Sequence, residues 1–265
     1  MEVINDDLPT TAMAMRLRGV KNQFGAQVIH ESLDLDVRRG EILGIVGGSG
    51  TGKSVLLRTI IGLNTPQMGR IDVLGEHVAA LGPNDRHEIE ARWGVLFQDG
   101  ALFSSLTVAQ NIQVPLKEHT EMSDVLLDEI AALKISMVGL PAEAGNKYPS
   151  ELSGGMRKRA GLARALALDP DIVFLDEPTA GLDPIGAAEF DQLILRLHAA
   201  MGMTVFMVTH DLDSLHAICD RIAVLAEKRV IVCGTMAEMM QQAHPWIHEY
   251  FHGPRARAAI ATKEA

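Results

Sequence analysis

The sequence has few cysteines, no excess of basic residues and no long apolar run. Its 265 residues include two cysteines, Cys219 and Cys233. Neither has a metal-ligand spacing around it, so both are typical of small apolar residues in a reducing compartment, which favours the cytoplasm. A chain of this length also buries enough apolar surface to fold without disulfides.

The charge balance and the short apolar runs exclude further classes of protein. The formal net charge is −10, so a globally basic face for nucleic acid is lacking. The longest apolar runs, such as residues 42–46 and 172–175, are far shorter than a membrane span. The first residues are acidic, with Glu2, Asp6 and Asp7, and do not resemble a signal peptide. We expect no nucleic-acid partner, and any work at a membrane is expected to take place outside the bilayer.

The apolar runs that are present alternate with helical patterns. A short apolar run just before Gly47 is typical of a central strand covered on both faces, and similar runs occur late in the chain. One helical pattern begins at Asp183, a favourable N-cap, followed by Pro184 at the first helical position. Strands alternating with helices predict an α/β fold with a mostly parallel sheet. The strands are expected at 41–46, 172–176, 203–208 and 221–225, and the helices at 53–62 and 183–198.

Two other regions have a different character. Apolar and polar residues alternate between 15 and 37, which predicts half-buried strands, whereas residues 98–150 are helix-rich and lack buried-strand runs. Capping-box patterns beginning at Thr107 and Thr235 predict helix starts. We therefore divide the chain into a flexible leader (1–14), a core (15–97 and 151–234), an inserted helical subdomain (98–150), and a C-terminal helix with a tail (235–265).

A glycine-rich segment with the P-loop pattern follows the first buried strand and precedes a helix. Glycines let backbone N–H groups approach phosphate oxygens closely, and a helix start directs its positive dipole end at the anion. Lys53 would contact the β- and γ-phosphates and Ser54 would ligate Mg²⁺. The alternative is a glycine-rich turn with an incidental lysine, and the strand–loop–helix setting argues against it. The predicted nucleotide-binding residues are Gly47, Gly48, Ser49, Gly50, Thr51, Gly52, Lys53 and Ser54.

Two adjacent carboxylates end another predicted buried strand, at residues 172–176. Such a strand delivers its last side chains to the carboxyl edge of the sheet, where open α/β sheets bind ligands. Asp176 would hold Mg²⁺, and Glu177 would orient or deprotonate the attacking water. The alternative, a strand that ends in a solvated acidic turn, loses weight once the P-loop is considered.

A third segment, Leu152-Ser153-Gly154-Gly155-Met156, decides the family. With the two motifs above, it makes the chain resemble the nucleotide-binding subunit of an ABC (ATP-binding cassette) transporter from about Met15 to Gly234. The resemblance implies a RecA-like P-loop core with an antiparallel β subdomain and an inserted helical subdomain. It also implies that Ser153, Gly154 and Gly155 complete the ATP site of a second copy of the chain. Met156 departs from the family, in which glutamine is frequent at this position.

The resemblance assigns roles to four further residues, each of which has a plainer alternative. Phe24 resembles the aromatic that stacks on adenine, or is a core strand residue. Gln98 resembles the glutamine that senses Mg²⁺ and the γ-phosphate, or is a surface residue. Asp183 resembles the residue that links the two sites across the dimer, and also suits a helix cap. His210 resembles the histidine that contacts the γ-phosphate and holds Glu177, or is a capping histidine.

The sequence of residues 96–108 indicates one branch of the family. It resembles the ATPases of bacterial MCE-type lipid transporters, the Mla systems, which implies a phospholipid cargo and a peripheral position on the cytoplasmic face of the inner membrane. The implied partners are a permease like MlaE, a lipid-binding MCE protein like MlaD and a small accessory subunit like MlaB. Leu102 and Phe103 would contact the permease, unless they are core residues. The alternatives are an ABC transporter for another substrate, a soluble ABC ATPase and a P-loop kinase.

Overall fold

The computed structural model describes residues 12–253, and the chain divides into two compact units. One unit comprises the chain up to Leu81 together with the chain from Phe206 onward, and the other comprises Gly82–Val205. The predicted tail from residue 254 and most of the predicted leader lie outside the described residues. Within the described part, no helix is long and apolar enough to cross a membrane.

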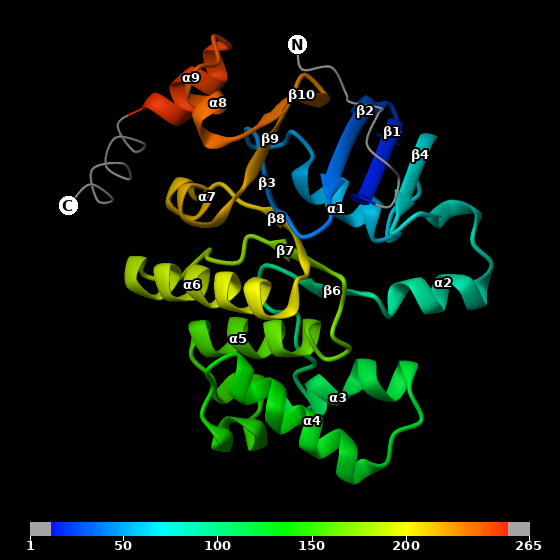
Figure 1. Ribbon diagram of the computed structural model, residues 1–265, viewed down its shortest axis with the longest axis vertical. Coiled ribbons are helices and arrows are strands. Elements are labelled where there is room, and N and C mark those ends of the chain that lie inside the picture. Colours follow the sequence, from blue (N-terminus) through cyan, green and yellow to red (C-terminus); the bar gives the residue numbers. More distant parts are fainter. Residues whose placement is uncertain (1–11, 254–265) are drawn as a thin grey trace. The chain divides into compact units, whose positions relative to one another are not determined.

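An antiparallel sheet occupies the start of the first unit, in strand order β2-β1-β4-β5. Its strands are β1 (Met13–Phe24), β2 (Gln27–Arg38), β4 (Met68–Val73) and β5 (Glu76–His77), and a short 3-10 helix, η2 (Val78–Ala80), follows. Figure 1 shows β1, β2 and β4 side by side in blue and cyan. Leu33, Leu35 and Val37 of β2 are buried while the residues between them are more exposed, as the alternation in the sequence predicts.

The rest of the first unit holds the P-loop strand and the end of the chain. β3 (Ile42–Val46) is buried along its whole length and pairs in parallel with β9 (Arg221–Ala226), which pairs antiparallel with β10 (Arg229–Gly234). The helices of this part are α1 (Lys53–Ile60), α7 (Leu212–Ile218), α8 (Met236–Met240) and α9 (Pro245–His252). A continuous apolar cluster joins α7, α8 and α9 to strands β3 and β9, and it is formed by Val46, Leu215, Ile222, Val224, Met239, Ile247 and Phe251.

The second unit contains a parallel strand pair and most of the helices. β6 (Trp93–Leu96) pairs in parallel with β7 (Ile172–Asp176). Figure 1 shows α3, α4 and α5 packed together in green. β8 (Thr204–Val208) carries the chain back into the first unit. The helices are α2 (Pro83–Glu90), α3 (Val108–His119), α4 (Asp124–Met137), η3 (Ala142–Asn146), η4 (Pro149–Glu151), α5 (Gly154–Ala165) and α6 (Pro184–Met201).

The predicted α/β fold is confirmed, and most predicted elements lie within two or three residues of their expected bounds. Both predicted capping boxes form, at Thr107 and at Thr235. β1 begins at Met13, inside the predicted leader, because Met13 and Ala14 are buried and Met13 pairs with Arg38 of β2. The predicted division into core and helical subdomain follows other boundaries than the two compact units, so it stays a prediction.

Candidate nucleotide-binding site

The P-loop connects β3 to α1 in the first unit. Thr51 braces the loop from within, because its amide and its hydroxyl both donate to the carbonyl oxygen of Gly48, at 3.3 and 2.9 Å. The Lys53 ammonium donates to the carbonyl oxygens of Gly47 (2.9 Å) and Gly48 (3.3 Å), which holds its positive charge inside the curve of the loop. The loop, the start of α1 and the Lys53 ammonium thus lie together, an arrangement that suits an anion such as phosphate.

Two glycines of the loop have no room for a side chain. Gly52 precedes α1 with a φ of +95°, and a Cβ there would lie 2.4 Å from Cγ2 of Ile29 and 2.6 Å from Nε2 of His30. A Cβ on Gly47 would lie 2.3 Å from the carbonyl oxygen of Leu225. Since real Cβ atoms do not approach other atoms so closely, the neighbouring strands dictate glycine at both positions.

His30 of β2 forms the floor of the P-loop, and sequence reasoning missed it. Its side chain is fully buried, and the Asn22 amide nitrogen lies 2.9 Å from its Nδ1. With Nδ1 as the acceptor, the ring proton belongs on Nε2, facing the loop. Among the residues that the structure describes, none offers this Nε2 a hydrogen bond of full geometry. Burial accordingly lowers the pKa of His30 to about 4, although the backbone of Gly52 and Thr51 opposes the shift.

Two further predicted residues belong to the same unit. Phe24 is the last residue of β1 and its side chain is 52% exposed, so it is not the core residue that the plainer interpretation expected. His210 is exposed and lies two residues beyond β8, directly before Asp211, the N-cap of α7. Both side chains are therefore exposed on the unit that holds the P-loop.

The acidic pair lies in the second unit, at the end of β7. Asp176 is the last residue of this fully buried strand and is itself only 6% exposed. Glu177 follows with a φ of +51°, a left-handed conformation that is uncommon for residues other than glycine. Because β6 runs parallel to β7, with Leu96 paired to Leu175, Gln98 follows the same end of the strand pair. The structure therefore brings Gln98 to the edge that carries both carboxylates.

A buried lysine, which no sequence pattern indicated, contacts the backbone of both Gln98 and Glu177. Lys158 of α5 is 6% exposed, and its ammonium donates to the carbonyl oxygens of Gln98 (2.8 Å) and Glu177 (3.0 Å). Burial lowers the pKa of Lys158, while the negative charges of Asp99 and Glu177 oppose the shift. One side chain of the helix that begins at the signature segment thus fixes the backbone of both predicted catalytic residues.

The loop after Gln98 is held by two more polar side chains. Gly100 and Ala101 both have a positive φ, and the Arg164 guanidinium donates to their carbonyl oxygens, at 3.0 and 2.7 Å. Asn111 is fully buried; its carbonyl oxygen accepts from the Phe103 amide at 2.8 Å, and its amide nitrogen donates back to the Phe103 carbonyl oxygen at 3.1 Å. The loop is consequently held by side-chain hydrogen bonds at Gly100, Ala101 and Phe103.

The signature segment is a helix start, as predicted. Ser153 is the N-cap of α5, and its hydroxyl oxygen accepts from the Met156 amide at 3.2 Å. Gly154, exposed, and Gly155, half-buried, form the first turn, where backbone N–H groups lack helical partners. Asp183 caps α6 in the same way, accepting from the amides of Ile185 and Gly186 at 3.1 and 3.0 Å. Its plainer role as a cap is therefore confirmed.

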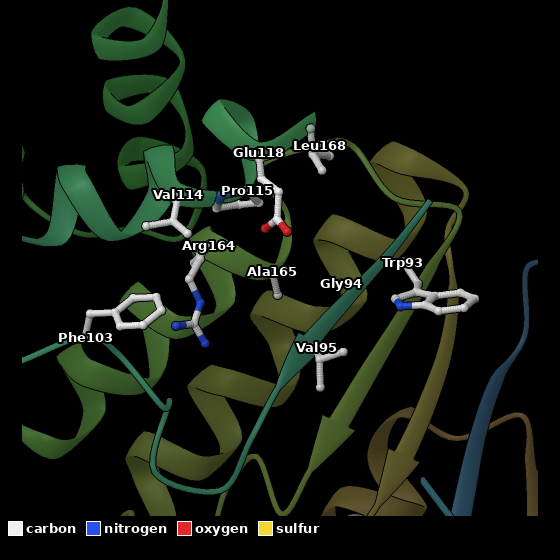
Figure 2. Close-up of a pocket in the computed structure, with 10 residues that line it drawn as sticks. All are labelled: Trp93, Gly94, Val95, Phe103, Val114, Pro115, Glu118, Arg164, Ala165 and Leu168. Carbon is white, nitrogen blue, oxygen red and sulfur yellow. The ribbon is translucent and has the colours of Figure 1, made fainter. Parts of the chain in front are cut away.

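A pocket of about 270 Å³ opens beside this loop in the second unit. Figure 2 shows the Phe103 ring and the Arg164 guanidinium side by side at its edge, with Val114, Pro115 and Glu118 of α3 beyond them. Phe103 is 50% exposed and Leu102 is half-buried, so Phe103 is not a core residue. The pocket is lined by Trp93, Gly94, Val95, Phe103, Val114, Pro115, Glu118, Arg164, Ala165 and Leu168.

Comparison with known families identifies the cassette. A family model described as "ABC transporter" matches residues 30–180, which is more than half of the chain. This chain belongs to the ABC transporter family. The chain is thus an ATP-binding cassette, and ATP hydrolysis is its activity. The matched range includes the P-loop, Gln98, the signature segment and the acidic pair.

Individual relatives cover most of this ABC cassette. The "Probable ribonucleotide transport ATP-binding protein mkl" of Mycobacterium leprae is 39% identical over 92% of this chain and 70% of its own length. The "Intermembrane phospholipid transport system ATP-binding protein MlaF" is 38% identical in Haemophilus influenzae and 37% identical in Escherichia coli K12, where the matches span 92% and 90% of the relatives' lengths.

Solved ABC cassettes share the fold. The dimeric cassette MJ0796, in a post-hydrolysis state bound to ADP and Pi, superposes with a TM-score of 0.76 at 30% identity, covering 83% of this chain and 98% of its own. The cassette cbiO1 of Clostridium perfringens gives a TM-score of 0.78 at 25% identity, covering 95% and 99%. The predicted family and fold are confirmed by these likenesses.

Proposed function

We propose that this cassette is the ATP-hydrolysing subunit of an inner-membrane transporter that moves phospholipid between the inner and outer membranes. The observation that carries the cargo is the 37–38% identity with two relatives that are named as ATP-binding proteins of intermembrane phospholipid transport systems. The mkl protein, at 39% identity, is named for ribonucleotide transport, so a nucleotide cargo is the alternative that the lipid measurement below tests.

Phe24 is proposed to stack on the adenine of ATP, and Gly47 to Ser54 are proposed to bind its phosphates. The donors proposed for Mg²⁺ are all oxygen atoms, from the Ser54 hydroxyl, the Gln98 amide and the Asp176 carboxylate, and hard cations prefer such ligands. The ion would neutralise charge on the β- and γ-phosphates. Asp176 suits this role because it ends the buried strand β7 at the edge that also carries Glu177 and Gln98.

Glu177 is the proposed base that orients or deprotonates the attacking water. Lys158 supports this role, because its two hydrogen bonds fix the peptide of Glu177 relative to that of Gln98. His210 is proposed to contact the γ-phosphate and to hold Glu177 in place. Each group acts on a phosphate or on water already in position, so the main contribution of the protein is preorganisation.

Two copies of the cassette are proposed to enclose two ATP molecules. In this arrangement, Ser153, Gly154 and Gly155 of one copy offer a hydroxyl and helix-start N–H groups to the γ-phosphate bound by the other copy's P-loop. Asp183 is proposed to connect the two sites across the dimer. ATP favours the closed pair because it binds that pair more tightly than the open one, and hydrolysis removes the bridge.

The pocket beside Phe103 is the proposed docking site for the membrane permease. It is bordered by an exposed aromatic ring, and its loop directly follows Gln98. Lys158 holds the carbonyl group of Gln98, and Arg164 holds that of Gly100. Movement of a permease helix seated there would be transmitted to the residue proposed to sense the γ-phosphate. The proposed partners are an MlaE-like permease contacting Leu102 and Phe103, an MlaD-like MCE protein and an MlaB-like accessory subunit, all at the cytoplasmic side of the inner membrane.

Affinity purification from detergent-solubilised membranes tests the proposed cargo. We expect the tagged cassette to retain a permease and an MCE protein, and lipid extraction of that complex to yield phospholipid above the level of a tagged, unrelated cassette. Replacing Phe103 with aspartate should release the permease while leaving the cassette folded, because its ring is half exposed. A complex without an MCE protein, or one that carries nucleotide instead of lipid, would reject phospholipid as the cargo.

A further inference from the structure

The last described helix lies outside the part of the chain that the family model matches, yet it is built into the core of the first unit. α9 begins with Pro245 at its first position and carries three aromatic residues in eight. Ile247 and Phe251 are 1% and 0% exposed and belong to the apolar cluster that contains Val46 of the P-loop strand. The helix is thus fixed rigidly beside the strand that leads into the P-loop.

The outer aromatic residues of α9 face the nucleotide machinery. The Tyr250 hydroxyl donates a hydrogen bond of 2.9 Å to the carbonyl oxygen of His210. The Trp246 and Tyr250 rings are stacked, with centroids 4.8 Å apart and planes inclined by 15°. A Cβ added to Gly48 would lie 3.6 Å from Nε1 of Trp246, so the indole lies against the P-loop. One stacked pair therefore lies beside the P-loop and donates a hydrogen bond to the backbone of His210.

The backbone on either side of His210 is anchored elsewhere. The Thr209 amide donates to the carbonyl oxygen of Ile45 in β3 at 3.2 Å, and the Asp211 amide donates to the Thr209 hydroxyl at 3.0 Å. Asp211 also caps α7. The hydrogen bond from Tyr250 holds the carbonyl oxygen of His210, which lies between the bonded amides of Thr209 and Asp211. It therefore limits rotation of the backbone at His210.

We propose that α9 is a positioning element for catalysis, in which Tyr250, seated by its stack on Trp246, sets the backbone of His210 against the γ-phosphate of ATP bound at the P-loop. The inference rests on the role proposed above for His210. Tyr250 is proposed to act through the backbone of His210, so it is a positioning residue. A helix outside the region that the family model matches thereby supports the residue proposed to contact the γ-phosphate.

The first experiment separates turnover from binding in the full-length chain. Y250F removes one hydroxyl and leaves the stack intact, so kcat for ATP hydrolysis should fall about fivefold, the equivalent of one hydrogen bond, while KM for ATP changes less than about twofold. Tyr148 is the other tyrosine of the chain and belongs to the second unit, which makes Y148F the matched control. An equal fall in both variants, or wild-type kcat in Y250F, would overturn the proposal.

The second experiment uses the indole as its own reporter. The chain has two tryptophans, so in the W93F variant Trp246 is the only indole. Its fluorescence should change when ATP binds. Adding the Y250F substitution should reduce the size of this change at saturating ATP, while the ATP concentration at half of the change should shift by less than about twofold. A Trp246 signal that ignores ATP while a fluorescent ATP analogue still binds would contradict the proposed contact.

One further variant distinguishes failure of this inference from failure of the proposed site. H210A should abolish turnover in the wild-type background, and Y250F added to it should then have no further effect. If H210A retains turnover, the role of the histidine falls and the tyrosine proposal falls with it. If H210A is inactive and Y250F matches the wild type, only the positioning role is rejected.

Discussion

Replacing His30 with phenylalanine tests whether the P-loop floor is an uncharged imidazole. The ring is fully buried against Gly52, and burial lowers its pKa from 6.5 to about 4. The H30F substitution keeps an aromatic ring of similar size but removes the titration and the contact between Nδ1 and the Asn22 amide. The loss of that hydrogen bond should lower the free energy of unfolding by about 1 kcal/mol at pH 8.

The pH dependence follows from the direction of the shift. Between pH 6.5 and pH 4, the unfolded chain carries a proton on His30 that the folded chain does not, so acid favours unfolding. The stabilisation is complete above pH 6.5 and is lost as the pH falls toward 4, at about 1.4 kcal/mol per unit. By pH 4.5 the wild type should have lost about 2.5 kcal/mol from this group, and H30F should then be the more stable protein.

Urea unfolding followed by circular dichroism between pH 8 and pH 4.5 measures this crossover. The difference between wild type and H30F isolates His30, because every carboxylate titrates in both proteins. H248F, which removes an exposed imidazole from α9, serves as the control for the loss of a histidine away from the P-loop. Parallel stability curves for wild type and H30F across this range would refute a buried, neutral His30 beneath the P-loop.

Two other substitutions test the machinery around it. G52A places a Cβ 2.4 Å from Ile29 and should lower stability by about 2 kcal/mol or more, whereas G48A, with no contact under 3.6 Å, should not; equal melting temperatures would contradict the packing. K158M leaves the carbonyl groups of Gln98 and Glu177 without their ammonium, so kcat should fall at least about tenfold with KM for ATP changing little; a kcat within twofold of wild type would show that the bridge is dispensable.

The sequence was sufficient wherever the motif and its setting are local. The P-loop, the acidic pair and the signature segment each combine a few adjacent residues with a neighbouring strand or helix, and all three occur where predicted. The buried strands were recognisable because continuous apolar runs suit a sheet covered on both faces. Asp183 and Thr107 were recognised as caps from short-range chemistry alone.

The remaining features depend on contacts between distant segments, which no local pattern encodes. His30 lies 22 residues before Gly52, and in the sequence it is one more polar residue in a strand of alternating apolar and polar positions. Lys158 reads as a surface lysine on a helix until the packing of α5 buries it against Gln98 and Glu177. β4 and α9 were missed because their apolar residues are short sets that become cores only when packed against other elements.

The central claim is that each ATP site combines the P-loop of one copy with the signature segment of the other. The mass of the E177Q variant in solution tests this claim most directly. Without its proposed base the cassette should bind ATP and fail to hydrolyse it, so light scattering should show ATP shifting the 28.7 kDa chain to twice that mass. With ADP the mass should remain 28.7 kDa, and adding the K53A substitution should abolish the ATP-dependent increase in mass. An E177Q chain that binds ATP yet stays at 28.7 kDa, or one that hydrolyses ATP at the wild-type rate, would contradict the account.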